Sequence, residues 1–302
     1  MLKDNMFSSV FNWFYEPFSF AFMQQALYTA LLVSIVCALL SCYLVLKGWS
    51  LMGDAISHAV LPGIVIAFIL GLPLAIGAFV AGIFCAFATG YLKENSRLKE
   101  DTVMGIVFSG MFAFGLILFV KVETDQHLNH ILFGNLLGVT AAEFRVTFWI
   151  SLITFAVVFL RRKDFLLYCF DPIQAAVAGL SVRKLHYLLL VLLALTIISA
   201  MQVVGVILVV ALLIAPGITA FSLTKRFSRM LVIAIAVSIF STLFGTIISY
   251  HLDSATGPTI VLMQSCCFIL ALACSAWRNR SNKIGSNQIS QAISEAPIKS
   301  IK

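Results

Sequence analysis

An aspartate and a histidine stand four residues apart in the segment SLMGDAISHAVLPG, residues 50–63, between two long apolar runs. Residues i and i+4 share one face of a helix, so we expect the Asp54 carboxylate and the His58 imidazole to lie side by side. One oxygen donor and one nitrogen donor together suit Mn²⁺, Fe²⁺ or Zn²⁺ better than an alkali cation. Two donors are too few for a complete coordination shell, so further ligands must come from a second chain, water or another loop.

The neighbouring residues predict that this pair lies inside a membrane. If one helix continued from Lys47 at about 1.5 Å per residue, His58 would be about 16 Å deep, near the middle of a hydrocarbon core about 30 Å thick. Ionisable groups at that depth are costly and face a cavity or a partner. Gly53, Pro62 and Gly63 predict helix breaks on both sides of the pair, as in transport sites built on broken helices.

A structural interpretation of the same residues is equally open. Aspartate is a favoured N-cap, so Asp54 would cap a helix that begins at Ala55. His58 would then donate a hydrogen bond between packed helices. Spacing alone does not decide between metal handling and this structural role.

The elements that hold these residues are expected to be membrane helices. Of 302 residues, 61% are hydrophobic and 11% charged, and the mean hydropathy is +1.03, whereas soluble domains carry about 25% charged residues. We predict an all-α integral membrane protein, a polytopic bundle of about eight or nine transmembrane helices with broken helices and a cytoplasmic helix. Long apolar runs place the helices near residues 21–46, 55–70, 73–92, 103–120, 144–160, 187–201, 203–223, 231–250 and 258–277. The runs 187–201 and 203–223 are either separate helices or one long bent element.

The distribution of cations predicts the orientation. If the loop LKENSRLKED is cytoplasmic, seventeen of the twenty Lys and Arg residues lie inside and only Lys3, Lys121 and Arg145 lie outside, as the positive-inside rule requires. The net charge of +7 then reflects topology rather than nucleic-acid binding. Residues 1–277 form the predicted membrane domain, and the polar tail 278–302 is predicted to be disordered and cytoplasmic.

Two further polar clusters fall on the predicted outer side. His251 and Asp253 follow a helix, and a turn leading into the last helix is favoured over a role in metal entry, with Pro258 in its first turn. The second cluster lies on an outer loop and is expected to be only solvated, with attraction of cations or docking of a partner as the alternatives; it consists of Glu123, Asp125, His127 and His130.

On the inner side, the segment CFDPIQAAVAGLSVRK interrupts the hydrophobic pattern. Asp171 and Pro172 are typical of a helix start and Gly179 of a helix end. Such a short helix, within the region 164–184, is either a lever for another protein or an ordinary interfacial helix.

Several activities are excluded or disfavoured. The chain has no Gly-Lys dipeptide, so it has no GxxxxGK[ST] loop with which to bind ATP. The seven cysteines form no CxxC pair, and neither a disulfide framework nor a thiolate metal site is expected. No catalytic constellation is present, so an enzyme is not predicted.

Six segments, in this order, carry a resemblance to a known family: LKGWSLMGDAISHAVLPG, DTVMGIVFSGMFAFGL, HILFGNLLGV, FDPIQAAVAGL, VVGVILVVALLIAPGITA and YHLDSATGPTIVL. Over residues 17–277 the chain resembles the membrane permeases of the manganese/iron/zinc ABC importers, and most of all those of the chelated-iron and manganese systems. The resemblance implies that Asp54 and His58 are intramembrane metal residues. It also implies a coupling helix over 171–180, whose positions include Asp171, Pro172, Gln174, Ala175 and Gly179.

The expected function is therefore a permease of a bacterial inner-membrane importer for Mn²⁺ or Fe²⁺, with Zn²⁺ less favoured. The resemblance implies a cytoplasmic ABC ATPase that uses ATP, a periplasmic or surface-anchored metal-binding protein, and a second permease protomer, identical or related, within the lipid bilayer. No cofactor bound by the chain itself is expected. The alternative is a secondary transporter driven by an ion gradient, in which Asp54 and His58 would relay protons, and a non-transporting scaffold or sensor ranks last.

Overall fold

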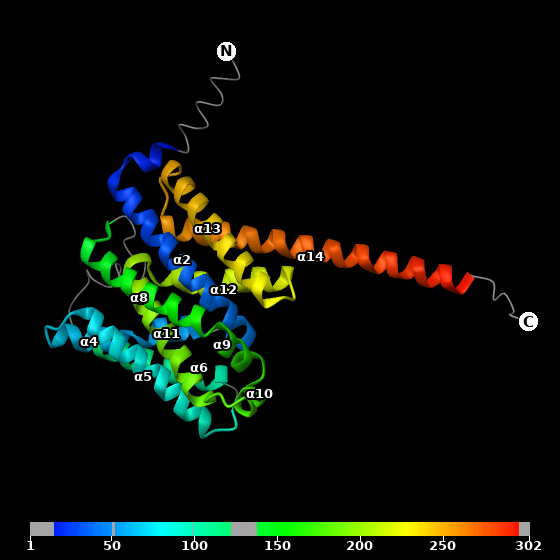
Figure 1. Cartoon of the computed structure of the whole chain (residues 1–302). Helices are drawn as coiled ribbons and strands as arrows, with labels where there is room; N and C mark the ends of the chain where they lie inside the picture. Colours follow the sequence, from blue (N-terminus) through cyan, green and yellow to red (C-terminus); the bar gives the residue numbers. More distant parts are fainter. Residues whose placement is uncertain (1–14, 50–51, 99, 122–137, 296–302) are drawn as a thin grey trace, which may run out of the picture.

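The computed structural model describes residues 15–49, 52–98, 100–121 and 138–295, and this part of the chain consists of helices joined by turns. Nine segments within it are long and apolar enough to cross a membrane, which confirms the predicted all-α membrane protein. In chain order the elements are η1 (Glu16–Ser19), α2 (Ala21–Lys47), α3 (Met52–Ala59), α4 (Leu61–Ile69), α5 (Leu74–Glu94), α6 (Glu100–Val120), α8 (Ala141–Leu160), α9 (Arg162–Phe170), α10 (Pro172–Val177), α11 (Val182–Val204), α12 (Val206–Leu223), α13 (Phe227–His251) and α14 (Thr256–Glu295) (Figure 1).

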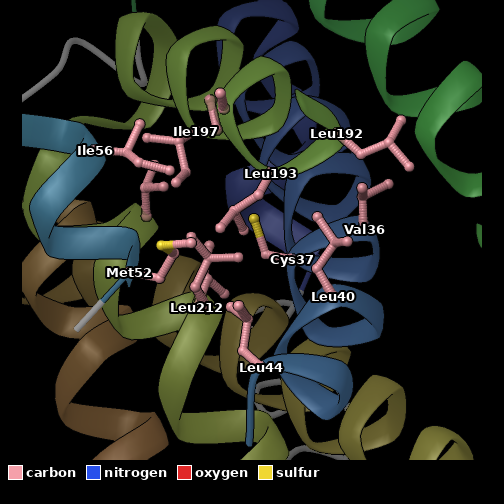
Figure 2. Packing of buried hydrophobic residues seen from close by; sticks show 14 of the residues in the cluster. Val36, Cys37, Leu40, Leu44, Met52, Ile56, Leu192, Leu193, Ile197 and Leu212 are labelled. Atoms are coloured by element: carbon pink, nitrogen blue, oxygen red, sulfur yellow. The ribbon is translucent and has the colours of Figure 1, made fainter. Parts of the chain in front are cut away.

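The centre of the bundle is formed by α2, α11 and α12. In the most apolar stretches of α2 and α11, 72% of the residues are buried, against 17% in α6 and in α14. Lipid is as apolar as leucine, so this core is held by close packing rather than by the hydrophobic effect. Figure 2 shows the interlocking side chains, among them Val36, Cys37, Leu40, Leu192, Leu193 and Leu212.

Two glycines in the left-handed region separate consecutive helices. Gly48, at φ +75°, ends α2, and the backbone N–H of Trp49 donates to the carbonyl of Leu44 at 2.9 Å, a common helix ending. Gly205, at φ +80°, lies between the last residue of α11 and the first of α12. The two apolar runs on either side of Gly205 are therefore separate helices.

Small and hydroxylated residues bring the outer helices onto the core. Ala234, Ser238 and Thr242 of α13, which follow one another at four-residue spacing, are all buried. The Ser238 hydroxyl donates to the carbonyl of Ser34 in α2 at 3.0 Å. Small side chains at this spacing allow two helices to approach closely, near enough for a short hydroxyl side chain of one to reach the backbone of the other.

One end of the bundle collects cations and ion-pairing groups. Arg183, near the start of α11, forms two hydrogen bonds with Glu94 at the end of α5, at 3.0 and 3.1 Å. Lys47, at the end of α2, lies over the ring of Tyr168 in α9, 4.2 Å from its centre. We call this the cation-rich end, and it also carries α10 (Figure 1).

Helix α14 extends beyond the other helices in Figure 1. Its apolar, membrane-compatible part is Thr256–Arg278, and the helical backbone continues to Glu295. The predicted boundary between residues 277 and 278 and the predicted disorder of the tail stay predictions.

Candidate metal site and coupling helix

Helix α3 holds the two residues that could bind a metal on one face. The Nε2 atom of His58 lies 3.3 Å from Oδ1 of Asp54, one helical turn away. The side chains are 33% and 41% exposed, respectively. The pair thus presents a carboxylate oxygen and an imidazole nitrogen together on an open face of a membrane-spanning segment.

The opposite face of α3 is anchored in the core. Met52 and Ile56 are 1% exposed and point toward Ile197 and Leu212 (Figure 2). Gly53 also lies on the packed side, because a Cβ there would come 3.1 Å from Cδ1 of Leu213. This packing fixes the rotation of α3 and hence the direction in which Asp54 and His58 point.

Helix α6 forms one wall beside the pair. The ring of Phe112 meets the His58 ring edge-on, with 5.2 Å between ring centres. Further along α6, the nitrogen of Pro62 lies 2.8 Å from where a Cβ on Gly115 would stand. A glycine is needed there because only a residue without a side chain admits this approach.

The helix break near the pair falls at Val60, between α3 and α4. Pro62 lies in the first turn of α4, where the missing N–H of proline is tolerated. Gly53 and Gly63 are the second residue of α3 and the third residue of α4, so the helix breaks on the two sides of the pair fall beside these glycines rather than at them. Gly63 is needed for packing, since a Cβ there would overlap the carbonyl oxygen of Gly77 in α5.

The predicted depth of His58 rested on a continuous helix from Lys47, and that premise is wrong. Gly48 ends α2, and α3 begins at Met52. In Figure 2, α3 runs in the opposite direction to α2, on the other side of the core side chains. His58 therefore stands six residues into a new segment, about 9 Å along its axis from Met52.

Within the described residues, no group of three or more His, Cys, Asp and Glu side chains is placed to hold a metal ion. The Asp54–His58 pair accordingly has two donors from this chain. The outer-loop residues Glu123, Asp125, His127 and His130 lie outside the described part.

His251 and Asp253 lie where α13 ends, and there the chain turns. His251 is the last residue of α13, and its ring meets that of Tyr250 with 5.2 Å between centres. Asp253 has a φ of +49°, and the N–H of Ser254 donates to the carbonyl of Ser249 at 3.0 Å. This geometry supports the turn that the sequence favours, and Pro258 lies in the first turn of α14.

The short helix α10 is built as its sequence predicts. The Oδ1 atom of Asp171 accepts hydrogen bonds from the N–H groups of Ile173 and Gln174, both at 3.0 Å. Pro172 is the first helical residue, and Gly179 follows the helix at φ +81°. An N-cap, a proline at the first position and a left-handed glycine together account for a helix of only six residues.

One face of α10 is apolar and open. Ala175 is fully buried, but Ile173 and Val177 are 78% and 83% exposed. Phe170, the last residue of α9, is 80% exposed beside them. Exposed apolar side chains on a short helix are found both on protein-binding surfaces and on helices that lie at the membrane interface.

Several contacting residues were not found from the sequence. Phe112 beside His58 is one; Trp49, Tyr168 and His186, which meet at the cation-rich end, are the others. Each is an ordinary aromatic or histidine within its own segment. No local pattern signals contacts between residues so far apart in the chain.

Comparison with known proteins identifies the family. A family model described as the ABC 3 transport family matches residues 19–275. The chelated iron transport system membrane protein YfeD of Yersinia pestis is 65% identical over 263 residues, covering 87% of this chain and 89% of that protein. The manganese transport system membrane protein MntB of Synechocystis sp. is 44% identical over 290 residues, covering 93% and 95%.

A solved structure agrees with these sequence matches. PsaBC from Streptococcus pneumoniae, in complex with Fab, matches at a TM-score of 0.74 and 40% identity, over 83% of this chain and 91% of that chain. The family model extends from the start of α2 into α14 and so includes the Asp54–His58 pair and α10. This chain therefore belongs to the ABC 3 transport family, as a multi-pass membrane permease.

Proposed function

We propose that the chain is the membrane-spanning permease of an ATP-driven importer for Mn²⁺ or Fe²⁺, with Zn²⁺ less favoured. The observation that carries this proposal is the Asp54–His58 pair, 3.3 Å apart on an open face of a membrane-spanning segment. Oxygen and nitrogen donors suit these ions. The relatives named for iron and manganese transport support the same substrates.

The open face of the Asp54–His58 pair supports the presence of a second permease chain, identical or related, that covers this face. Lipid does not cover ionisable side chains at low cost, and two donors do not complete a coordination shell. Small exposed residues of α6 (Ser109, Gly110 and Ala113) lie next to Phe112, and a Cβ at Gly110 would meet open space. A second helix can approach closely over such residues. The ion then passes between two chains, each of which supplies Asp54 and His58 or their equivalents.

The cation-rich end is the cytoplasmic side in this proposal, and the membrane is the bacterial inner membrane. Lys47, Arg183 and α10 lie at this end, in keeping with the positive-inside rule. The C-terminal tail is cytoplasmic as well. A periplasmic or surface-anchored metal-binding protein then delivers the ion to the opposite end.

A separate ATPase supplies the energy and docks on α10. The chain lacks a phosphate-binding loop of its own, and membership of an ABC family supports ATP as the source of energy. The exposed Phe170, Ile173 and Val177 provide an apolar docking surface. The Asp171 cap stiffens α10, so that it moves as a unit when the ATPase moves.

Transport in proteoliposomes tests the proposal. The chain is reconstituted with its ATPase and its metal-binding protein, and uptake of Mn²⁺, Fe²⁺ and Zn²⁺ is followed with and without ATP. We expect ATP-dependent uptake of Mn²⁺ or Fe²⁺ that survives collapse of the ion gradients by ionophores. Uptake that needs no ATP and disappears with the gradients would instead establish the secondary transporter.

A further inference from the structure

The segment that joins α2 to α3 and the pair α9–α10 meet in a small group of side chains at the cation-rich end. The Tyr168 hydroxyl and Nδ1 of His186 share a hydrogen bond of 2.8 Å. The Trp49 ring meets the edge of the His186 ring, with 5.6 Å between centres. Lys47 lies over the other partner, the Tyr168 ring, at 4.2 Å. We call Trp49, Tyr168 and His186 the relay cluster.

On one side, the relay cluster is joined to α10 without an intervening loop. Tyr168 lies in α9, and the N–H of Asp171, the cap of α10, donates to the carbonyl of Leu167 at 2.9 Å. Helix α9 is itself held on α2, because the ring of Phe165 packs edge-on against Tyr43 at 6.0 Å. A displacement of α10 is therefore passed to Tyr168, which lies three residues before its cap.

On the other side, the relay cluster adjoins the first residue of α3. Trp49 is 2% exposed, and its carbonyl accepts a hydrogen bond of 3.4 Å from the N–H of Met52, the first residue of α3. Asp54 follows Trp49 by only five residues. A shift of the Trp49 ring consequently moves the first turn of α3 and, with it, the Asp54 carboxylate.

The cluster also contains a buried group that is unpaired in this arrangement. Within the described residues, the indole N–H of Trp49 is buried and has no hydrogen-bond partner. A buried donor without a partner is costly. A movement of the cluster that gave this indole N–H a hydrogen-bond partner would therefore lower the free energy. An element with two discrete arrangements is what coupling between distant sites requires.

We propose that Tyr168, through its hydrogen bond to His186, transmits movement of α10 to Trp49 and α3, and so positions Asp54 and His58. The proposal deepens the proposed function and rests on it. Tyr168 touches neither the ion nor the ATPase in this account and is a positioning residue. Its loss should therefore lower the number of ions moved per ATP hydrolysed, rather than ATP hydrolysis itself.

The test compares Tyr168→Phe with the wild type in proteoliposomes that contain the ATPase and the metal-binding protein. This change removes one hydroxyl and keeps the ring beneath Lys47. We expect Mn²⁺ uptake per ATP to fall about fivefold, consistent with a typical coupling energy, with ATP hydrolysis and assembly unchanged. Tyr91→Phe is the matched control, since Tyr91 is 65% exposed near the end of α5, and it should leave the ratio unchanged.

A second variant breaks the same hydrogen bond from the other partner. His186→Gln should lower the ratio similarly, and the double variant should lower it no further than either single change. An unchanged number of ions moved per ATP in both single variants contradicts the relay. A parallel fall of uptake and ATP hydrolysis contradicts it too. Both outcomes leave the proposed function standing. A wild type without ATP-dependent uptake contradicts the proposed function and the relay with it.

Discussion

The carbonyl oxygen of Gly77 stands where a Cβ on Gly63 would have to be, and the carbonyl of Gly63 stands in the same relation to Gly77. Helices α4 and α5 therefore touch backbone to backbone, five residues beyond His58. In a membrane, where apolar side chains gain little from leaving lipid, such contact is a main source of helix association. The position of α4 next to the Asp54–His58 pair depends on two residues that have no side chain.

Gly63→Ala should disturb this contact. The added methyl group forces α4 and α5 apart, and overpacking of this kind costs about 1–3 kcal/mol. Thermal unfolding of the purified chain in detergent should show a lower midpoint. Gly105→Ala in α6, where a Cβ would meet open space, is the matched control. Equal midpoints for the two variants would show that α4 and α5 do not depend on the contact.

Asp54→Asn should abolish metal uptake and leave the assembled transporter intact. The amide keeps the size of the side chain and one oxygen but loses the negative charge that attracts a divalent cation. We expect uptake to fall by at least about tenfold, a loss of roughly 1.4 kcal/mol or more in binding the ion during its passage. Co-purification with the ATPase reports assembly. Uptake at the wild-type level would remove Asp54 from the metal site.

Asp253→Asn is the counterpart in the outer turn. Asn tolerates the left-handed conformation that Asp253 adopts at φ +49°, so stability should change by less than about 0.5 kcal/mol. If Asp253 serves the turn, uptake measured beside Asp54→Asn stays at the wild-type level. A clear loss of uptake would instead assign Asp253, and with it His251, to the path of the ion.

Asp171→Ala should loosen α10. The change removes the oxygen that accepts from Ile173 and Gln174, and loss of such a cap costs about 0.5–2 kcal/mol. A frayed α10 should capture less ATPase in a pull-down and support less transport. Asn is as good an N-cap as Asp, so Asp171→Asn should retain both. Equal losses in the two variants would point to the charge rather than the cap.

Arg183→Glu tests how the cation-rich end contributes to docking. Reversing this charge breaks the pair with Glu94, and we expect weaker co-purification of the ATPase. Exposed ion pairs contribute only about 0–1 kcal/mol, so the fold should survive. If Arg183 acts only through its partner, adding Glu94→Arg restores docking. If it contacts the ATPase directly, the swap does not restore docking. Unchanged co-purification in Arg183→Glu would contradict a role for Arg183.

Much of the architecture follows from composition and local signals. The apolar run predicted to be a helix over 21–46 is the helix Ala21–Lys47. Helix α10 begins after Asp171 and at Pro172, and it ends before Gly179, as these residue types predict. The start of α11 at Val182 was missed because Arg183 and Lys184 make the first turn polar, although it is helical. Hydropathy predicts which residues can lie within the membrane, but it does not predict the residue at which a helix begins.

Long-range contacts were beyond the reach of the sequence. Glycine is a common helix breaker, and Gly63 was therefore predicted to mark a break. Its packing role, however, depends on Gly77, a residue of another helix. Tyr168 and His186 are brought together because α9 folds back on α2 and α11. No periodic pattern in the sequence predicts this arrangement of helices. The spacing of Asp54 and His58 did predict their contact, because both lie on one helical turn.

Metal accumulation in cells that lack other importers tests the central claim most directly. Wild type and His58→Ala are compared at matched expression, and Mn²⁺, Fe²⁺ and Zn²⁺ are followed in parallel. If the Asp54–His58 pair carries the ion, the wild type accumulates Mn²⁺ or Fe²⁺ and His58→Ala does not. Equal accumulation in the two would contradict the account, because His58 would then serve only its contact with Phe112.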